Sequence, residues 1–143
     1  MYLSDISNGG ATPALIQTLS FNEARLRVIS ENVANATTPG YRSQQLDTGL
    51  FQSSLKEALD RRSHRSEPLL TDGGEQVQAD SDGRLHVSPV LEPADHTLFH
   101  DGTNISIEQE MADLAKTAMS HDLFSEVLLG YFSGLRKAIR GTV

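Results

Sequence analysis

The chain has 143 residues, the size of one domain, and contains no cysteine. Its formal net charge is −7, so it lacks the basic balance of a general nucleic-acid-binding protein. Without cysteine it can form no disulfide, thiolate metal site or cysteine nucleophile. Only 38% of its residues are hydrophobic and 6% aromatic, which is little for covering a sizeable core. We therefore expect a small helical domain, or a protein that buries its apolar stripes against copies or partners.

The first predicted element is a helix from about residue 13 to residue 36. Thr12 suits a helix cap and Pro13 suits the first turn. Residues spaced alternately by four and three then form a heptad seam that is apolar at every step but one. The seam consists of Leu15, Leu19, Asn22, Leu26, Ile29, Val33 and Ala36. Pro39 and Gly40 fit the centre of a type II turn, so the helix should end before them.

The middle of the chain, residues 42–104, is more polar than either end. Residues 50–59 place their apolar side chains on one face and predict a short helix. Residues 60–82 are rich in Ser, Gly, Asp and Glu, and we expect poor order there. Residues 84–90 alternate weakly between apolar and polar, which indicates a short strand. The strand positions are Leu85, Val87 and Val90.

The C-terminal end predicts a second and longer helix, begun by a capping box of Ser106 and Gln109 and ended at Gly141. Acidic residues in its first turns and basic residues in its last complement the helix dipole. Its seam again alternates spacings of four and three. The seam consists of Ile107, Met111, Leu114, Ala118, His121, Ser125, Leu128, Phe132, Leu135 and Ile139. Such a helix is roughly 50 Å long, more than a small domain can cover.

These elements predict a mainly α fold in which long terminal heptad helices form a coiled-coil-like pair. The chain divides into residues 1–41 with the first helix and turn, residues 42–104 as a polar and partly disordered middle with short strand pieces, and residues 105–143 with the long helix. A monomeric helical hairpin would already satisfy both seams. The length of the seams beside so polar a middle favours assembly with copies or partners.

Sites for catalysis or metal binding are weakly indicated. His96 and His100 would share a face only on a helix, and the Pro93 before them and the Gly102 after them favour a loop. Residues 72–75 and 80–83 resemble calcium loops but lack the bidentate acid at the required distance, so we expect turns. No nucleophile elbow, phosphate loop or dinucleotide turn is present in the sequence. We expect no catalytic residue, metal site, cofactor or small-molecule substrate.

The end of the first helix carries a specific pattern, Asn-x-Ala-Asn-x-x-Thr-Pro-Gly-Tyr. The matching residues are Asn32, Ala34, Asn35, Thr38, Pro39, Gly40 and Tyr41. This stretch resembles the N-terminal signature of the flagellar axial proteins, which form the rod and hook of the bacterial flagellum. Residues 46–59, 101–111 and 135–141 are similar to the proximal members of the basal-body rod protein family. The remaining middle segment has no clear counterpart.

The resemblance implies a structural subunit of the flagellar basal-body rod, not an enzyme, that polymerises through its terminal helices into the proximal drive shaft. The implied subunit-packing residues are Leu15, Leu19, Leu26, Ile29, Val33, Ile107, Met111, Leu114, Leu128, Phe132, Leu135 and Ile139. Implied partners are other rod subunits, copies of itself, the membrane-ring adaptor protein and the flagellar type III export apparatus, with no nucleic acid. The resemblance also implies export to the periplasmic rod without a cleaved signal, which agrees with an N-terminus that lacks the features of a signal peptide.

Three other interpretations remain open at this point. The chain could be another axial subunit of the rod, since it has His121 and Asp122 where many proteins of the family it resembles have a Tyr-Gln-like pair. It could be a coiled-coil adaptor or regulator in the cytoplasm, because paired heptad helices serve that role as well. A metal-dependent hydrolase would have to use His96 and His100.

Overall fold

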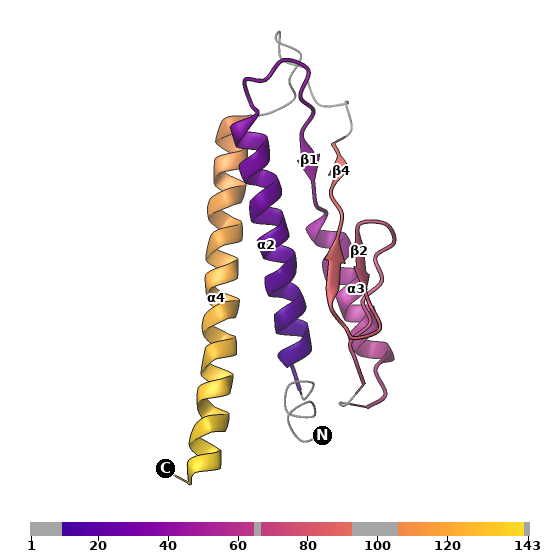
Figure 1. Ribbon diagram of the computed structural model, residues 1–143, viewed down its shortest axis with the longest axis vertical. Coiled ribbons are helices and arrows are strands. Elements are labelled where there is room, and N and C mark those ends of the chain that lie inside the picture. Colours follow the sequence, from indigo (N-terminus) through magenta and orange to yellow (C-terminus); the bar gives the residue numbers. More distant parts are fainter. Residues whose placement is uncertain (1–9, 65–66, 93–105, 142–143) are drawn as a thin grey trace.

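The computed structural model describes residues 10–64, 67–92 and 106–141. Two long helices lie side by side, and a third helix with four short strands packs along one of them (Figure 1). The elements are α2 (Thr12–Ala34), β1 (Gln44–Gln45), α3 (Thr48–Arg61), β2 (Val77–Ala79), β3 (Leu85–Val87), β4 (Val90–Leu91) and α4 (Ile107–Arg140). The fold is therefore mainly helical, with long terminal helices and short strands between them, as the sequence predicts.

Identifiable capping residues set the C-terminal end of α2 and both ends of α4. Asn35 leaves the helical region at φ −104° and ends α2 two residues before the predicted boundary. The Ser106 hydroxyl accepts a hydrogen bond from the Gln109 N–H at 3.5 Å and begins α4. Gly141 ends α4 in the left-handed conformation at φ +67°. Both predicted ends of the C-terminal helix are confirmed.

The predicted cap at Thr12 is wrong. Ala11, one residue earlier, is the N-cap, and it makes no side-chain capping bond. Its backbone already has helical angles, so Thr12 lies inside the first turn with Pro13. The Thr12 hydroxyl is buried and has no hydrogen-bond partner among the described residues.

The core forms on a second face of α2 that the heptad seam does not include. Phe21 stacks on Phe51 of α3 with ring centroids 4.3 Å apart and planes 4° apart. Burying one such ring stabilises the fold by about 1.5–3 kcal/mol. The buried cluster consists of Phe21, Ala24, Val28, Leu46, Phe51 and Val77. As a result α2 packs against α4 and, in addition, against the middle segment.

The strands make two small antiparallel pairs, β1 with β4 and β2 with β3. In the second pair Val77 lies opposite Val87 and Ala79 opposite Leu85. The predicted strand positions Leu85, Val87 and Val90 fall in β3 and β4, and the predicted short helix is α3. The Asp47 carboxylate caps α3 by accepting the Leu50 N–H at 3.0 Å.

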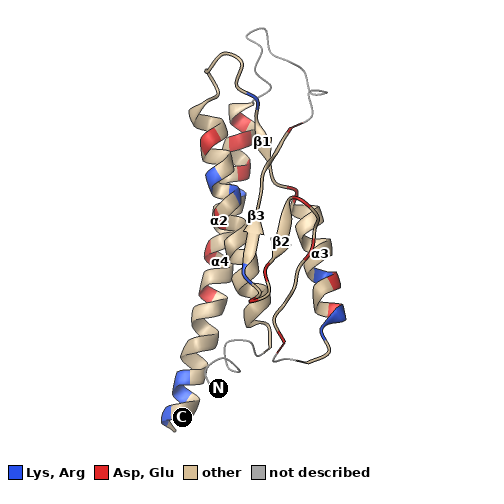
Figure 2. Cartoon of the chain, turned by 45° about the vertical axis from the view of Figure 1, so that its right-hand side comes forward, with Lys and Arg blue, Asp and Glu red and all other residues tan. Residues whose placement is uncertain are grey.

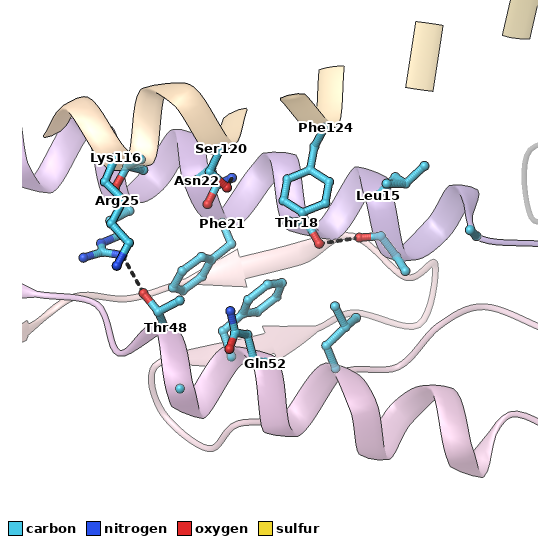
Figure 3. Close-up of a pocket in the computed structure, with 16 residues that line it drawn as sticks. Leu15, Thr18, Phe21, Asn22, Arg25, Thr48, Gln52, Lys116, Ser120 and Phe124 are labelled. Atoms are coloured by element: carbon cyan, nitrogen blue, oxygen red, sulfur yellow. Dashed lines mark hydrogen bonds between the residues drawn. The ribbon is translucent and has the colours of Figure 1, made fainter. Parts of the chain in front are cut away.

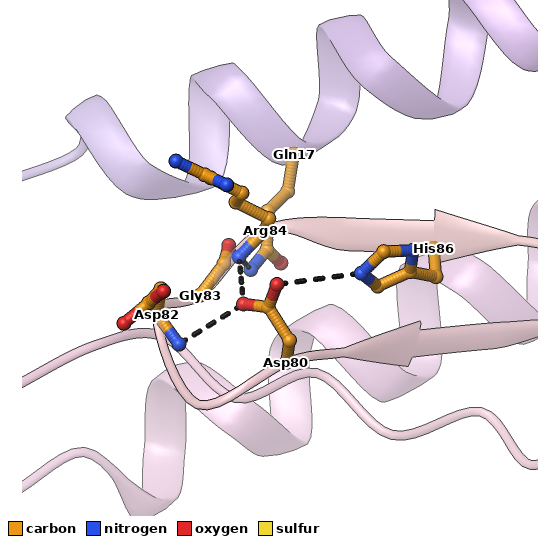
Figure 4. A network of polar contacts seen from close by, with 6 residues as sticks. All are labelled: Gln17, Asp80, Asp82, Gly83, Arg84 and His86. Atoms are coloured by element: carbon orange, nitrogen blue, oxygen red, sulfur yellow. Dashed lines mark hydrogen bonds and ion pairs between the residues drawn. The ribbon is translucent and has the colours of Figure 1, made fainter.

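The turn between β2 and β3 is organised by Asp80 (Figure 4). Its carboxylate accepts the backbone N–H groups of Asp82 and Arg84, both at 2.9 Å, and lies 3.3 Å from the His86 ring. The Arg84 N–H, together with His86, lowers the pKa of this carboxyl. The acidic residues that resemble a calcium loop thus build a turn.

The expectation of poor order over residues 60–82 is wrong for residues 67–82. Leu69 and Val77 are 1% and 0% exposed, and Thr71 is also buried. The Gln17 side-chain amide donates hydrogen bonds to the Leu69 carbonyl at 2.7 Å and the Gly83 carbonyl at 2.9 Å. A polar segment is held here because α2 supplies both an apolar surface and a buried amide to bind it.

Within the part of the chain that the structure describes, neither long helix combines the length and apolarity needed to cross a bilayer.

Candidate assembly site on the helix pair

The two long helices run antiparallel, and polar side chains fix their alignment. Three contacts cross the pair at different heights. They join Asn22 to Ser120 (3.1 Å), Arg25 to Asp113 (3.7 Å) and Asn32 to Glu110 (3.4 Å). Directional contacts of this kind set the register of two helices whose apolar side chains would also tolerate sliding.

Asn32 of the signature is the best-connected of these side chains and is 2% exposed. Its amide nitrogen donates to the Gln44 carbonyl at 2.8 Å and lies 3.4 Å from both Glu110 oxygens. Its carbonyl oxygen accepts the Gln44 N–H at 3.0 Å and the Tyr41 hydroxyl at 3.2 Å. One side chain therefore ties together α2, the turn that follows it, β1 and α4.

The rest of the signature shapes the chain reversal after α2. The Asn35 amide donates to the Glu31 carbonyl at 2.9 Å. The Tyr41 N–H bonds to the Thr38 carbonyl at 3.1 Å, and Gly40 has φ +76°. A positive φ at the third residue is what a type II turn requires, so the predicted turn is confirmed. Ala34 is exposed and marks the last residue of the helix.

The carboxyl of Glu110 is held in an unfavourable setting for its charge. Partial burial raises its pKa, and the neighbouring carboxylates Glu92 and Asp113 raise it further, against the Asn32 hydrogen bond and the Arg25 charge. Burial also raises the pKa of the Tyr41 hydroxyl, with help from Glu31 and Glu110. At this end of the helix pair, burial and nearby negative charges therefore disfavour the ionised form of Glu110.

The seam predicted on the N-terminal helix is largely covered by the rest of the chain. Its members are half-buried or buried, and none is exposed. Ile29 is 5% exposed, and Leu15, Leu19, Leu26 and Val33 are intermediate. The chain itself therefore covers much of this seam.

The seam predicted on the C-terminal helix is far less covered. Thr117 is the only buried residue of α4. Leu114, Leu128 and Leu135 are half-buried. The exposed members are Ile107 at 47%, Met111 at 49%, Phe132 at 38% and Ile139 at 76%. Much of the predicted packing seam on α4 therefore faces outward in the single chain.

Further apolar side chains outside the seam are exposed on α4. Met119, Leu123 and Leu129 are 74%, 59% and 69% exposed. At Gly130 and Gly134 no described atom lies within 4 Å of an added Cβ, so no close approach occurs there within the chain. A helix that is apolar on several faces is normally buried in a larger structure.

Charges are divided along the helix pair, with Asp and Glu near its upper end and Lys and Arg at the C-terminal end of α4 (Figure 2). Glu108 and Glu110 lie in the first turn of α4, and Lys137 and Arg140 in its last. These charges compensate the helix dipole at each end and so stabilise a long helix most of whose residues are exposed.

A groove of about 710 Å³ runs between α3 and α4 with α2 as its floor (Figure 3). Phe21 and Phe51 form the base, and Phe124 lies on the α4 side. Arg25 donates to the Thr48 hydroxyl at 2.6 Å at one end. The groove is apolar along its base and cationic toward its rim.

The residues weighed as a metal site, His96 and His100, lie outside the described residues. Across residues 10–64, 67–92 and 106–141, no group of three or more potential metal ligands is found. His121, on the predicted seam, lies 3.6 Å from Asp122 and is half-buried.

Sequence reasoning missed the second face of α2, formed by Gln17, Phe21, Ala24, Val28 and Asn32. These residues also follow spacings of four and three, and that spacing was the available signal. Polar residues at both ends of the row conceal it, because an amide does not count as apolar in a periodicity analysis. The groove was missed for the same reason, since its base lies on this face.

The chain is similar to known proteins both locally and along most of its length. The profile of a family described as flagella basal body rod protein matches residues 14–42, which are α2 and its turn. FlgB of Bacillus subtilis (strain 168), a flagellar basal body rod protein, is 26% identical over 132 residues, covering 92% of this chain and 95% of the relative. FlgB of Aeromonas hydrophila is 28% identical over 126 residues, covering 86% and 87%.

FlgB of Salmonella typhimurium is 24% identical over 132 residues, covering 87% of this chain and 89% of the relative. The matched profile ends just after the turn that Asn32 and Gly40 organise, so the signature is present in structure as well as in sequence. The chain is therefore similar to the flagellar basal body rod proteins, through this signature and, along most of its length, to FlgB.

Proposed function

We propose that the chain is a structural subunit of the proximal flagellar rod that polymerises through α2 and α4. The observation that carries this proposal is the outward apolar surface of α4. Phe132, Ile139 and Leu129 are 38%, 76% and 69% exposed on a helix that holds a single buried residue. In water such a helix is marginal, and packing against neighbouring subunits would stabilise it.

The role of each helix follows from how much of it the chain already covers. Most of the α2 seam packs against the rest of the chain, so we assign it to holding the subunit together. The α4 seam supplies the surface for neighbours, chiefly through Ile107, Met111, Phe132 and Ile139. We infer that the subunit has no catalytic role, because Asn32 and Glu110, its best-connected polar residues, serve the joint between its helices.

As a rod protein the chain interacts with other components of the flagellar basal body. We propose that these are copies of itself, neighbouring rod subunits and the membrane-ring adaptor. We also propose that the chain reaches the periplasm through the flagellar type III export apparatus without a cleaved signal. The secondary interpretation as a cytoplasmic adaptor has no specific observation in its favour.

The test places a charge on the exposed part of the α4 seam, with Phe132→Asp and Ile139→Asp. Both side chains are exposed, so the subunit should fold and be exported, yet fail to join the rod. Burying an unpaired charge costs several kcal/mol, and a polymer repeats that cost in each copy. The readout is the amount of the variant in purified basal bodies, together with motility in soft agar.

Ser53→Asp, on the exposed face of α3, is the matched control and should assemble normally. His96→Ala and His100→Ala should swim normally as well. Loss of motility in the histidine variants, with normal assembly of the two α4 variants, would show that function does not reside in the helices.

A further inference from the structure

The groove beside α2 is an unfilled, largely apolar surface formed by side chains of three different helices. Leu15 and Leu55 line the groove together with the stacked Phe21 and Phe51 rings. Its walls are α3 on one side and α4 on the other, and α2 is its floor. The space between two helices that pack on a third suits a fourth helix, as in a helical bundle.

A polar atom in the groove wall also lacks a partner. Thr117 lines the groove, is 2% exposed, and its hydroxyl makes no hydrogen bond to any described residue. Buried side-chain hydroxyls normally have at least one partner. The chain itself covers this hydroxyl, so the groove wall beside it is closed and the contact with a partner must come from the apolar base and the rim.

A second uncharged helix surface is present on the other side of α4. The α4 strip comprises Ile107, Met111, Ala118, Ser125, Leu129 and Phe132. None of these residues lines the groove, and the helical repeat of about 100° per residue puts them on the flank that faces away from it. The strip contains no charged residue.

Charges at the outer edges of the two surfaces are opposite. Lys116 lies exposed where α4 borders the groove. Asp122 lies beside the strip, with its side chain 82% exposed. Both residues point toward the outer side of α4, so two subunits placed side by side would bring a lysine edge to an aspartate edge.

We propose that the groove of one subunit receives the α4 strip of a second copy of this chain. The contact joins two different surfaces, so it is heterologous and each copy keeps one free groove and one free strip. Copies in the same orientation would therefore add side by side and build a tube wall. This inference rests on the proposed rod function and specifies the surfaces that it uses.

The test uses the absence of native cysteine, so that engineered thiols report only the chosen positions. One copy carries Gln52→Cys in the groove wall, and a co-expressed copy with a different tag carries Ala118→Cys in the strip. Oxidation of cells with assembled basal bodies should give a disulfide-linked dimer that contains both tags. Cells expressing only one of the two variants should give none.

Glu57→Cys, exposed on α3 and outside the groove lining, replaces Gln52→Cys as the matched control and should lose the dimer. If both cysteine variants are incorporated into the rod but no mixed dimer forms, the groove-to-strip contact is refuted while the rod function stands. If neither wild-type chain nor variant is found in basal bodies, the rod function itself fails.

A charge exchange tests the edges of the same contact. Lys116→Glu and Asp122→Lys should each lower the yield of the mixed dimer, and the two together should restore it. Restoration in the double variant supports a contact between copies, because a different rod subunit would keep its own charges. If the double variant gives a lower yield of the mixed dimer than either single variant, the groove does not bind a second copy of this chain.

Discussion

Asn32 joins four parts of the molecule through one buried amide. Its two polar atoms contact Gln44, Tyr41 and Glu110, and each of these lies on a different segment. Aspartate at this position would place a second carboxylate beside Glu110 and would lose the donor to the Gln44 carbonyl. The amide is therefore required as both donor and acceptor, which explains why the signature contains asparagine here.

Asn32→Ala should lower the free energy of unfolding by about 2–3 kcal/mol, because the partly buried backbone groups of Gln44 are left without partners. Asn35→Ala in the same signature removes one bond to a helix carbonyl at a more exposed site and should cost less than about 1 kcal/mol. Urea unfolding followed by circular dichroism measures both. Equal losses for the two variants would contradict the central role of Asn32.

How the two long helices dock depends on a carboxyl at their upper end. The pKa of Glu110 is raised above its ordinary value of 4.5, chiefly by burial. Protonation therefore favours the docked state. The contribution of Glu110 to stability is fully present below pH 4.5 and is lost as the pH rises through the raised pKa.

Glu110→Gln should stabilise the helix pair at pH 7, since the amide avoids burial of a charge and can still bond Asn32. The advantage should vanish near pH 4, where the native carboxyl is itself neutral. The measurement is the urea midpoint at the two pH values. Glu108→Gln, exposed on the same turn, is the control and should change little at either pH. A loss of stability in Glu110→Gln at pH 7 would mean that the Arg25 charge outweighs the effect of burial.

Elements whose signals are local were predictable from the sequence. The spacing of apolar residues, Pro39 with Gly40, and the caps at Ser106 and Gly141 gave α2, its turn and α4 to within a few residues. These signals act within one or two turns of the chain, so they do not depend on tertiary partners. The type and position of the long helices follow directly from them.

Elements that depend on distant partners were predicted less well. Residues 67–82 look polar, yet Leu69 and Val77 are buried. The Gln17 amide on α2 binds the Leu69 carbonyl, and Val77 belongs to the same buried cluster as Phe21. The heptad seam of α4 was found, but not which part of it meets α2. That choice depends on the rotation of α4 about its axis, which side-chain spacing alone does not determine.

At the scale of the whole molecule, the two long helices differ in how much of their apolar surface the chain covers. This difference explains how a chain with few hydrophobic residues can fold. One helix, α2, holds the subunit together by packing on two sides, whereas α4 keeps most of its apolar side chains outward. The subunit is thus organised around α2 and presents α4 (Figure 1). An exposed apolar surface of this extent suits a protein whose final state is a polymer.

A density map of purified basal bodies at side-chain resolution tests this account most directly. We expect the antiparallel α2–α4 pair in the wall of the proximal rod, with Leu129, Phe132 and Ile139 in contact with neighbouring chains. Rod density that leaves this face of α4 in solvent, or in which the chain is absent, would contradict the assignment of assembly to α4.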